Sequence, residues 1–158
     1  MENPIRIDAR LLDAVSAKAQ VSERKRTNFN FHSHYADPIN RMLNAMEPGT
    51  YARPHKHEAS DKREVFIVLR GRLVVVFYDD EGTIVDQVLL DAAQGSWGVE
   101  IPPRVWHSVL ALETGSVVYE IKDGPYEPMT DKDFAPWAPA EGDPNCAAYM
   151  QRILEKLN

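Results

Sequence analysis

Short apolar segments separated by turn residues fill residues 27 to 122, and this pattern constrains the fold more than any other feature of the chain. Phe29 and Phe31 alternate with polar residues, which is typical of a strand with one buried face. Turn residues such as Gly71 and Gly82 separate the segments that follow. Short strands with turns roughly every 8 to 12 residues indicate a sandwich or barrel and not βαβ units. We predict further strands at 64–69, 73–78, 83–90, 98–101, 105–111 and 116–122.

Helical patterns flank this β-rich region. Asp8 is a candidate N-cap, and Leu11, Leu12 and Val15 follow at helical spacing. Beyond residue 123 the chain is rich in proline, which has no N–H to donate, so this stretch is not a sheet interior. The aromatic residues between its prolines predict an ordered arm over the barrel.

The arm leads into a predicted final helix. Asp143 and Pro144 are typical of an N-cap and a first helical position, and the helix is expected to run to about Leu157. We therefore expect one domain in three parts: an N-terminal helix and extension at 1–26, a β-barrel at 27–123, and a proline-rich arm with a C-terminal helix at 124–158.

Composition excludes several classes of function. A chain of 158 residues can bury roughly 70% of its unfolded surface, so it needs no disulfide. Its single cysteine, Cys146, is typical of a reducing compartment. The first residues lack the apolar run of a signal peptide and no segment has spanning length, so we expect a soluble, cytoplasmic protein that binds no membrane. The net charge of −6 disfavours nucleic-acid binding, which requires a basic face.

Three of the five histidines, with one glutamate, form the clearest candidate site. His55 and His57 stand at i and i+2, so on a strand both imidazoles point to the same face, about 7 Å apart. Glu64 follows closely, and His107 lies far downstream. Three imidazole nitrogens and one carboxylate oxygen suit a first-row divalent metal with coordination positions left open. We expect one such ion, zinc, iron, manganese or nickel, because this ligand set does not select among them.

Two of these observations have structural alternatives. Glu64 could instead form an ion pair with Lys62 or Arg63. A second His-X-His pair, His32 and His34, has no carboxylate behind it at a suitable spacing. We expect His32 to be a pocket wall or a polar residue on a strand face.

The spacing around the first pair resembles the first motif of the cupin superfamily: Gly, five residues, His-X-His, three or four residues, Glu, six residues, Gly. Here five residues separate Gly49 from His55, and six residues separate Glu64 from Gly71. Only the loop after the histidine pair is longer, and a loop between strands can absorb extra residues. A change between the Glu and the Gly would alter which face the Glu occupies, so the resemblance implies Glu64 and not Asp61 as the fourth ligand.

The second cupin motif, Gly, five residues, Pro-X-Gly, two residues and His, resembles the segment that ends at His107. Pro102 and His107 occupy their expected positions, whereas Arg104 and Ser96 replace the two glycines. Both replacements concern turn geometry more than ligation. The resemblance implies an all-β fold, a single cupin (double-stranded β-helix or jelly-roll) barrel, here with a short N-terminal helix and a C-terminal helix.

Nearly the whole chain is similar to the WbuC-type cupin metalloproteins, a family found in bacterial O-antigen polysaccharide gene clusters. The resemblance implies a small β-barrel with an N-terminal extension and a bound metal, and it supplies no reaction. It is carried by residues 41–45, 53–57, 99–102, 124–126 and 135–144.

The alternation of side chains along a strand predicts which residues surround the metal. Tyr51 and Arg53 share a face with the histidine pair, and Phe66 shares a face with the glutamate as part of an apolar floor. Glu120 and Lys122 share a face of the last strand, as a cross-strand ion pair or as pocket groups. We expect Tyr51 and Glu120 to be catalytic. Arg53, Phe66 and Lys122 are expected to bind ligand, because a guanidinium can hold a carboxylate or phosphate.

Three functions fit these residues. The first is a metal-dependent isomerase or epimerase of a sugar or nucleotide sugar in surface polysaccharide biosynthesis, with a proton moved by a protein group or a metal-bound water. The second is a non-haem iron dioxygenase. The third is a regulatory or binding module for a small anionic or sugar-like molecule. The N-terminal extension and the edge strands favour a homodimer.

Overall fold

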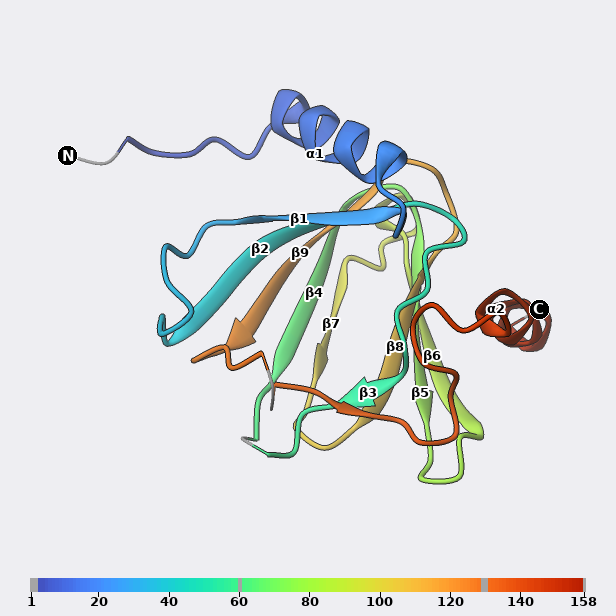
Figure 1. Ribbon diagram of the computed structural model, residues 1–158. Helices are drawn as coiled ribbons and strands as arrows, with labels where there is room; N and C mark the ends of the chain where they lie inside the picture. The colour runs from blue at the N-terminus through green and yellow to red at the C-terminus, as the bar shows by residue number, and fades with distance from the viewer. Residues whose placement is uncertain (1–2, 60, 129–130, 158) are drawn as a thin grey trace.

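Two antiparallel sheets face each other in the computed structural model, which describes residues 3–59, 61–128 and 131–157 (Figure 1). The first sheet comprises, in spatial order, β1 (Arg26–Asn30), β2 (Ile39–Met46), β9 (Ser116–Asp123), β4 (Glu64–Arg70) and β7 (Gly98–Ile101). The second comprises β10 (Asp133–Phe134), β3 (His55–Lys56), β8 (Trp106–Ala111), β5 (Leu73–Tyr78) and β6 (Ile84–Leu90). The predicted all-β jelly-roll class is confirmed, although the described strands form two sheets and not one closed barrel.

The N-terminal helix, α1 (Ala9–Val21), lies across the outer face of the first sheet (Figure 1). Asp8 caps it as predicted, because its carboxylate accepts a hydrogen bond from the Leu11 N–H at 3.1 Å. Val15 and Ala19 are buried against Leu43 and other outward-facing residues of β2 and β9. This packing fixes which face of β2 points outward.

The inward face of the first sheet follows from the same alternation. With Leu43 directed to the helix, Asn40, Met42 and Asn44 point between the sheets and line a cavity. On the neighbouring strand β9, Glu120 and Lys122 also line it. The first sheet therefore presents an unusually polar inner surface to this cavity.

An apolar core closes the other part of the space between the sheets. Phe66 and Val68 of β4 pack there with Val75 of β5, Val109 of β8 and Leu90 of β6. All five side chains are buried. This core holds the two sheets at a fixed separation beside the cavity.

The C-terminal arm crosses the second sheet and ends in a helix (Figure 1). Its strand β10 pairs with β3, and Ala135 and Ala138 are buried in a cluster that also holds Trp106 and Ile153. The helix, α2 (Cys146–Lys156), begins later than predicted. The Asp143 carboxylate accepts from the N–H of Asn145 and so closes the turn before the helix instead of capping it.

The described part of the chain contains no helix that is both long and apolar enough to span a membrane.

Candidate metal centre

Pairing between two strands brings distant histidines together. His55 of β3 lies directly opposite His107 of β8 in the antiparallel register, and their ring centroids are 4.5 Å apart. His57 follows β3 immediately, with its ring centroid 5.2 Å from that of His55. All three imidazoles are buried. The structure thus assembles the three predicted histidines in one place.

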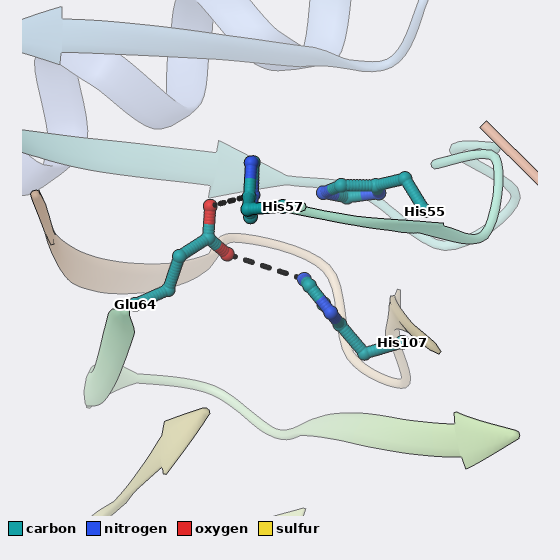
Figure 2. A group of neighbouring side chains, drawn as sticks. All are labelled: His55, His57, Glu64 and His107. Carbon is teal, nitrogen blue, oxygen red and sulfur yellow. Dashed lines mark hydrogen bonds and ion pairs between the residues drawn. The ribbon is translucent and has the colours of Figure 1, made fainter. Parts of the chain in front are cut away.

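Glu64 completes the group from the opposite sheet, at the first residue of β4 (Figure 2). One carboxylate oxygen lies 2.6 Å from His57 Nε2 and the other lies 3.2 Å from His107 Nε2. Each of the four side chains, those of His55, His57, Glu64 and His107, offers one atom, and these atoms all lie within 4.8 Å of one another. This group could hold a metal ion.

Backbone carbonyls fix the orientation of each imidazole. The Nδ1 atoms of His55 and His107 lie 3.0 and 2.9 Å from the carbonyl oxygens of Arg53 and Val105, and His57 Nδ1 contacts the carbonyl oxygen of Asp131. A carbonyl only accepts, so each Nδ1 carries a proton and donates it. In the neutral rings, every Nε2 then presents a lone pair to the centre, as metal-ligating histidines do.

The charge pattern at the centre fits a bound cation. His57 Nε2 is buried and makes no hydrogen bond to any described residue, although it lies 2.6 Å from a Glu64 oxygen. A lone pair and a carboxylate oxygen at that distance repel each other unless a cation or an added proton lies between them. Three nitrogens and one oxygen match the ligand set of first-row transition metals.

Burial and mutual charge shift the ligands toward their metal-binding forms. Desolvation lowers the pKa of His55 well below its usual range, which keeps that ring neutral. Burial alone would raise the pKa of Glu64, but hydrogen bonds and positive charge from His107 and His57, present when a proton lies on their Nε2 atoms, outweigh burial and hold that pKa well below the usual range. A cation bound at the same place would act in the same direction. A neutral imidazole and an ionised carboxylate are the forms that ligate a metal.

The alternative partners of Glu64 are engaged elsewhere. Lys62 forms an ion pair with Asp131 at 2.5 Å, and Arg63 forms one with Asp123 at 2.9 Å. Lys122 is the cation nearest to Glu64 among the ion pairs of the described residues, with 3.8 Å from its ammonium nitrogen to a carboxylate oxygen. Glu64 therefore faces the histidines and not the two basic residues beside it in sequence.

A cavity of about 590 Å³ opens beside the four-residue group. Among the residues predicted from sequence, Arg53, Phe66, Glu120 and Lys122 line it, together with His55 and Glu64. His32 also lines it and is buried.

Tyr51 lies elsewhere. Its hydroxyl donates to the carbonyl oxygen of Pro139 at 2.7 Å, and its ring packs edge-on against Tyr149 of α2. Burial raises its pKa above the usual value. Strand parity fails here because β3 begins only at His55, so residue 51 does not belong to a strand that continues to the histidines.

Arg53 lies at the cavity wall, two residues before the candidate ligand His55. Its guanidinium donates to the carbonyl oxygen of Ala135 at 2.7 Å and lies over the Phe134 ring, 5.4 Å from the ring centroid. The Nε of Arg53 is buried and has no hydrogen-bond partner among the described residues. The arm thus positions a guanidinium that keeps a donor available.

Glu120 and Lys122 stand side by side on the inward face of β9. Burial, reinforced by the charge of Glu64, raises the pKa of Glu120 to about 7, and its carboxylate accepts from the Asn44 amide. Lys122 forms an ion pair with Asp131 at 2.5 Å, and its pKa is raised because three carboxylates outweigh the effect of burial. Glu120 can therefore hold or release a proton near neutral pH.

Other cavity residues were not singled out from the sequence. Asn28 and Asn30 of β1, Asn40 of β2 and Lys132 of the arm all line the cavity. Lys132 is exposed to solvent at this part of the cavity. The sequence signal for the asparagines was their alternation with Phe29 and Phe31, which was interpreted only as a polar, solvent-facing side.

Arg104 shows how the chain accommodates its departure from the second cupin motif. It adopts a left-handed backbone with φ of 68°, at the position where the motif has glycine. Its side chain forms an ion pair with Asp61 at 2.6 Å. The turn before His107 is therefore made despite the substitution.

Solved structures share this architecture. The chain is similar to CapF, a capsular polysaccharide assembling protein from Staphylococcus aureus, at 22% identity and a TM-score of 0.59; the match covers 72% of this chain and 30% of that one. An L-ribose isomerase from Cellulomonas parahominis with L-psicose gives 16% identity, a TM-score of 0.54, and coverage of 72% and 70%. A cupin superfamily protein from Desulfitobacterium hafniense gives 12% identity, a TM-score of 0.54, and coverage of 76% and 93%.

The chain thus has the fold of these cupin structures, and its buried group of three histidines and one glutamate forms a candidate metal centre. At these identities the likeness to solved structures establishes the fold alone, and the chain spans less than a third of the length of the CapF chain described above. A comparison with curated proteins found no match. Residues 7–90, more than half of the chain, match the model of a domain of unknown function, DUF6016, and the chain belongs to that family.

Proposed function

We propose that this cupin binds one divalent transition metal through His55, His57, Glu64 and His107 and isomerises or epimerises a sugar or nucleotide sugar. The observation that carries the proposal is the convergence of four buried ligand atoms within 4.8 Å, beside a polar cavity. The metal, when bound, would supply Lewis-acid polarisation of a sugar carbonyl. Sugar chemistry is supported by the names of structural neighbours, an L-ribose isomerase and a capsular polysaccharide assembling protein.

In this proposal the protein's own residues bind the substrate and move the proton. Arg53 binds an anionic group of the substrate through its available donor. Glu120 takes a proton from the carbon next to the carbonyl and returns it to the former carbonyl carbon, while the hydroxyl proton of the first carbon passes to the carbonyl oxygen, which gives the isomer; its place in the cavity supports this role. An epimer forms when solvent water, and not Glu120, returns a proton to the opposite face of the first carbon. Lys122 orients the reacting oxygen, and Phe66 supplies the apolar floor that excludes water. Tyr51 is not part of this proposed step, because its hydroxyl is bonded to the arm.

Incubation of the metal-loaded protein with aldoses and nucleotide sugars in D2O tests the proposal directly. Proton abstraction from carbon predicts deuterium incorporation, seen by NMR as the loss of one C–H signal, in the wild type but not in Glu120→Gln. Glu127→Gln, a carboxylate outside the residues that line the cavity, serves as the matched control.

Two other outcomes would favour the alternative functions. Oxygen uptake that requires iron would support a dioxygenase, since three histidines and a glutamate also suit non-haem iron. Tight binding of a sugar without exchange or conversion would support a non-catalytic binding module. Either result would contradict the isomerase proposal.

A further inference from the structure

Four asparagines form a polar wall of the cavity, which we call the asparagine wall. They come from the inward faces of β1 and β2: Asn28, Asn30, Asn40 and Asn44. The register of β1 on β2 places Asn28 directly opposite Asn44. Inward faces of stacked sheets are normally apolar, because a buried amide without hydrogen bonds is destabilising. Asn28 and Asn30 lie on the exposed part of this wall and Asn44 is bonded to Glu120, so it is the buried Asn40 that requires a reason other than packing.

Asn40 gives the strongest indication that the wall binds something. It is 1% exposed, and neither its amide nitrogen nor its amide oxygen has a hydrogen-bond partner among the described residues. Such groups are rare in folded proteins and mark a place where a water or a ligand supplies the bond. Asn40 also lines the cavity, so its amide lies beside the space that a ligand would fill.

The distance from this amide to the metal ligands suits a sugar. In the sheet, Asn40 lies opposite Lys122, and Lys122 lies opposite Glu64. Two strand spacings of about 4.8 Å each therefore separate the backbones of Asn40 and Glu64, about 10 Å in total. A sugar bearing one substituent can extend between the two groups.

The chemistry of the wall favours hydroxyl groups. The Asn28 side-chain amide donates to Oδ1 of the Asn30 side chain at 2.5 Å, which leaves the side-chain N–H groups of Asn30 and Oδ1 of Asn28 for other partners. A sugar hydroxyl both donates and accepts, as these amides do. An anion is disfavoured here because the Glu120 carboxylate accepts from Asn44 on the same wall.

The opposite side of the cavity is positively charged and suits an anionic group. Arg53, next to β3, and Lys132, next to β10, line the cavity there, and Arg53 Nε lacks a partner among the described residues. We propose that the asparagine wall is a second subsite, which holds the hydroxyl groups of a sugar whose phosphate or carboxylate faces Arg53 and Lys132. This inference rests on the proposed function, and it adds the class and the orientation of the ligand.

Calorimetric titration of the metal-loaded protein tests the subsite. The probes are glucose, galactose and mannose 1-phosphates and the corresponding hexuronates, and methyl phosphate and acetate represent the two anions without the sugar. We expect Asn40→Ala and Asn30→Ala each to weaken binding of the preferred sugar probe about tenfold while binding of the matching small anion stays unchanged. Arg53→Ala should weaken both. Asn3→Ala, outside the cavity, is the control and should change neither.

The outcomes separate this inference from the proposed function. Sugar binding that is equal in the wild type, Asn40→Ala and Asn30→Ala would overturn the subsite but leave a metal-dependent sugar protein intact. The subsite would also be overturned if the wild type bound no sugar probe better than the matching small anion. Metal content, measured on the same samples, reports on the metal centre independently. A preference for phosphates or for carboxylates identifies which oxyanion the ligand carries.

The variant Asn40→Leu distinguishes a role of Asn40 in ligand binding from a role in stability alone. Replacing an unpartnered buried amide by an apolar side chain of similar size should leave the melting temperature of the ligand-free protein unchanged or raise it. Sugar binding should still weaken about tenfold. A folded, more stable variant with unchanged sugar affinity would contradict the proposal.

Discussion

At the scale of single residues, some groups of the candidate site were predictable from their spacing in the sequence and others were not. The positions of His55, His57, Glu64 and His107 were predicted from motif spacing, because a strand fixes the face of a side chain once its neighbours are known. The carbonyl oxygens that orient His55 and His107 belong to residues only two positions before them, whereas a partner from a distant part of the chain was not predictable. Asp131 is the clearest example, through its contact with His57.

Asp131 also carries a buried charge network. Its carboxylate is 2.5 Å from the ammonium groups of both Lys62 and Lys122, and all three residues are at most 4% exposed. We predict that Asp131→Asn lowers the free energy of unfolding by about 3 kcal/mol, because it leaves two buried ammonium groups without their carboxylate. Urea denaturation measures this. Asp123→Asn, which breaks only the exposed pair with Arg63, should lower it by less than about 1 kcal/mol.

The effect of Asp131 should depend on pH in a defined direction. Burial alone would raise its pKa, but Lys122 and Lys62 outweigh burial and lower it. A folded-state pKa below the unfolded value of about 4 stabilises the protein above that pH, and this contribution is lost as the pH falls through the folded-state pKa. The difference in unfolding free energy between wild type and Asp131→Asn should therefore shrink in acid. A difference that grew in acid would contradict the assigned ionisation.

At the scale of elements, long strands with regular alternation were predictable and short or polar ones were not. β4, β5 and β8 appear within about a residue of their predicted bounds, because apolar alternation and flanking turns define them. β2 was not singled out, since its inward face carries asparagines where an apolar residue was expected. β3 and β10 have two residues each and exist only because tertiary pairing stabilises them.

The turn between β4 and β5 depends on its glycine. Gly71 has φ of +73°, and a Cβ placed on it would lie 2.8 Å from the backbone Cα of Ser116. Gly142 has φ of +90°, but a Cβ there would meet nothing within 4 Å. We predict that Gly71→Ala lowers the unfolding free energy by more than about 3 kcal/mol, through backbone strain and a clash with the chain, whereas Gly142→Ala lowers it by about 1 kcal/mol through strain alone. Equal losses in thermal or urea denaturation would show that the close approach of Ser116 has no energetic consequence.

At the scale of the whole molecule, the cupin fold was predictable from two motifs. Which parts of the sheet surface stay exposed was visible only in the structure. The helix α1 covers the outer face of β1, β2 and β9, and the adjoining face of β4 stays open. There Ile67 and Leu69 are 38% and 37% exposed, and Trp97 beside the edge strand β7 is 62% exposed. An open apolar face next to an edge strand is suited to a second copy of the chain, in keeping with the predicted homodimer.

The dimer prediction concerns this face. Light scattering should give twice the monomer mass of 17.9 kDa for the wild type and the monomer mass for Ile67→Arg, because a buried unpaired charge opposes association. Val85→Arg, exposed on the other sheet, should leave the dimer intact. A monomeric wild type at micromolar concentration would refute the prediction.

The central claim, that this cupin-fold protein binds a metal, is tested most directly by its metal content. Mass spectrometry of untagged protein should find about one equivalent of a divalent transition metal in the wild type and in His34→Ala, whose histidine is exposed and outside the cluster. His107→Ala, which removes one of the four converging ligand atoms, should lose it while remaining folded. A folded wild type that holds no metal even after reconstitution would contradict the account, and the buried histidines would then have to act as acid–base groups.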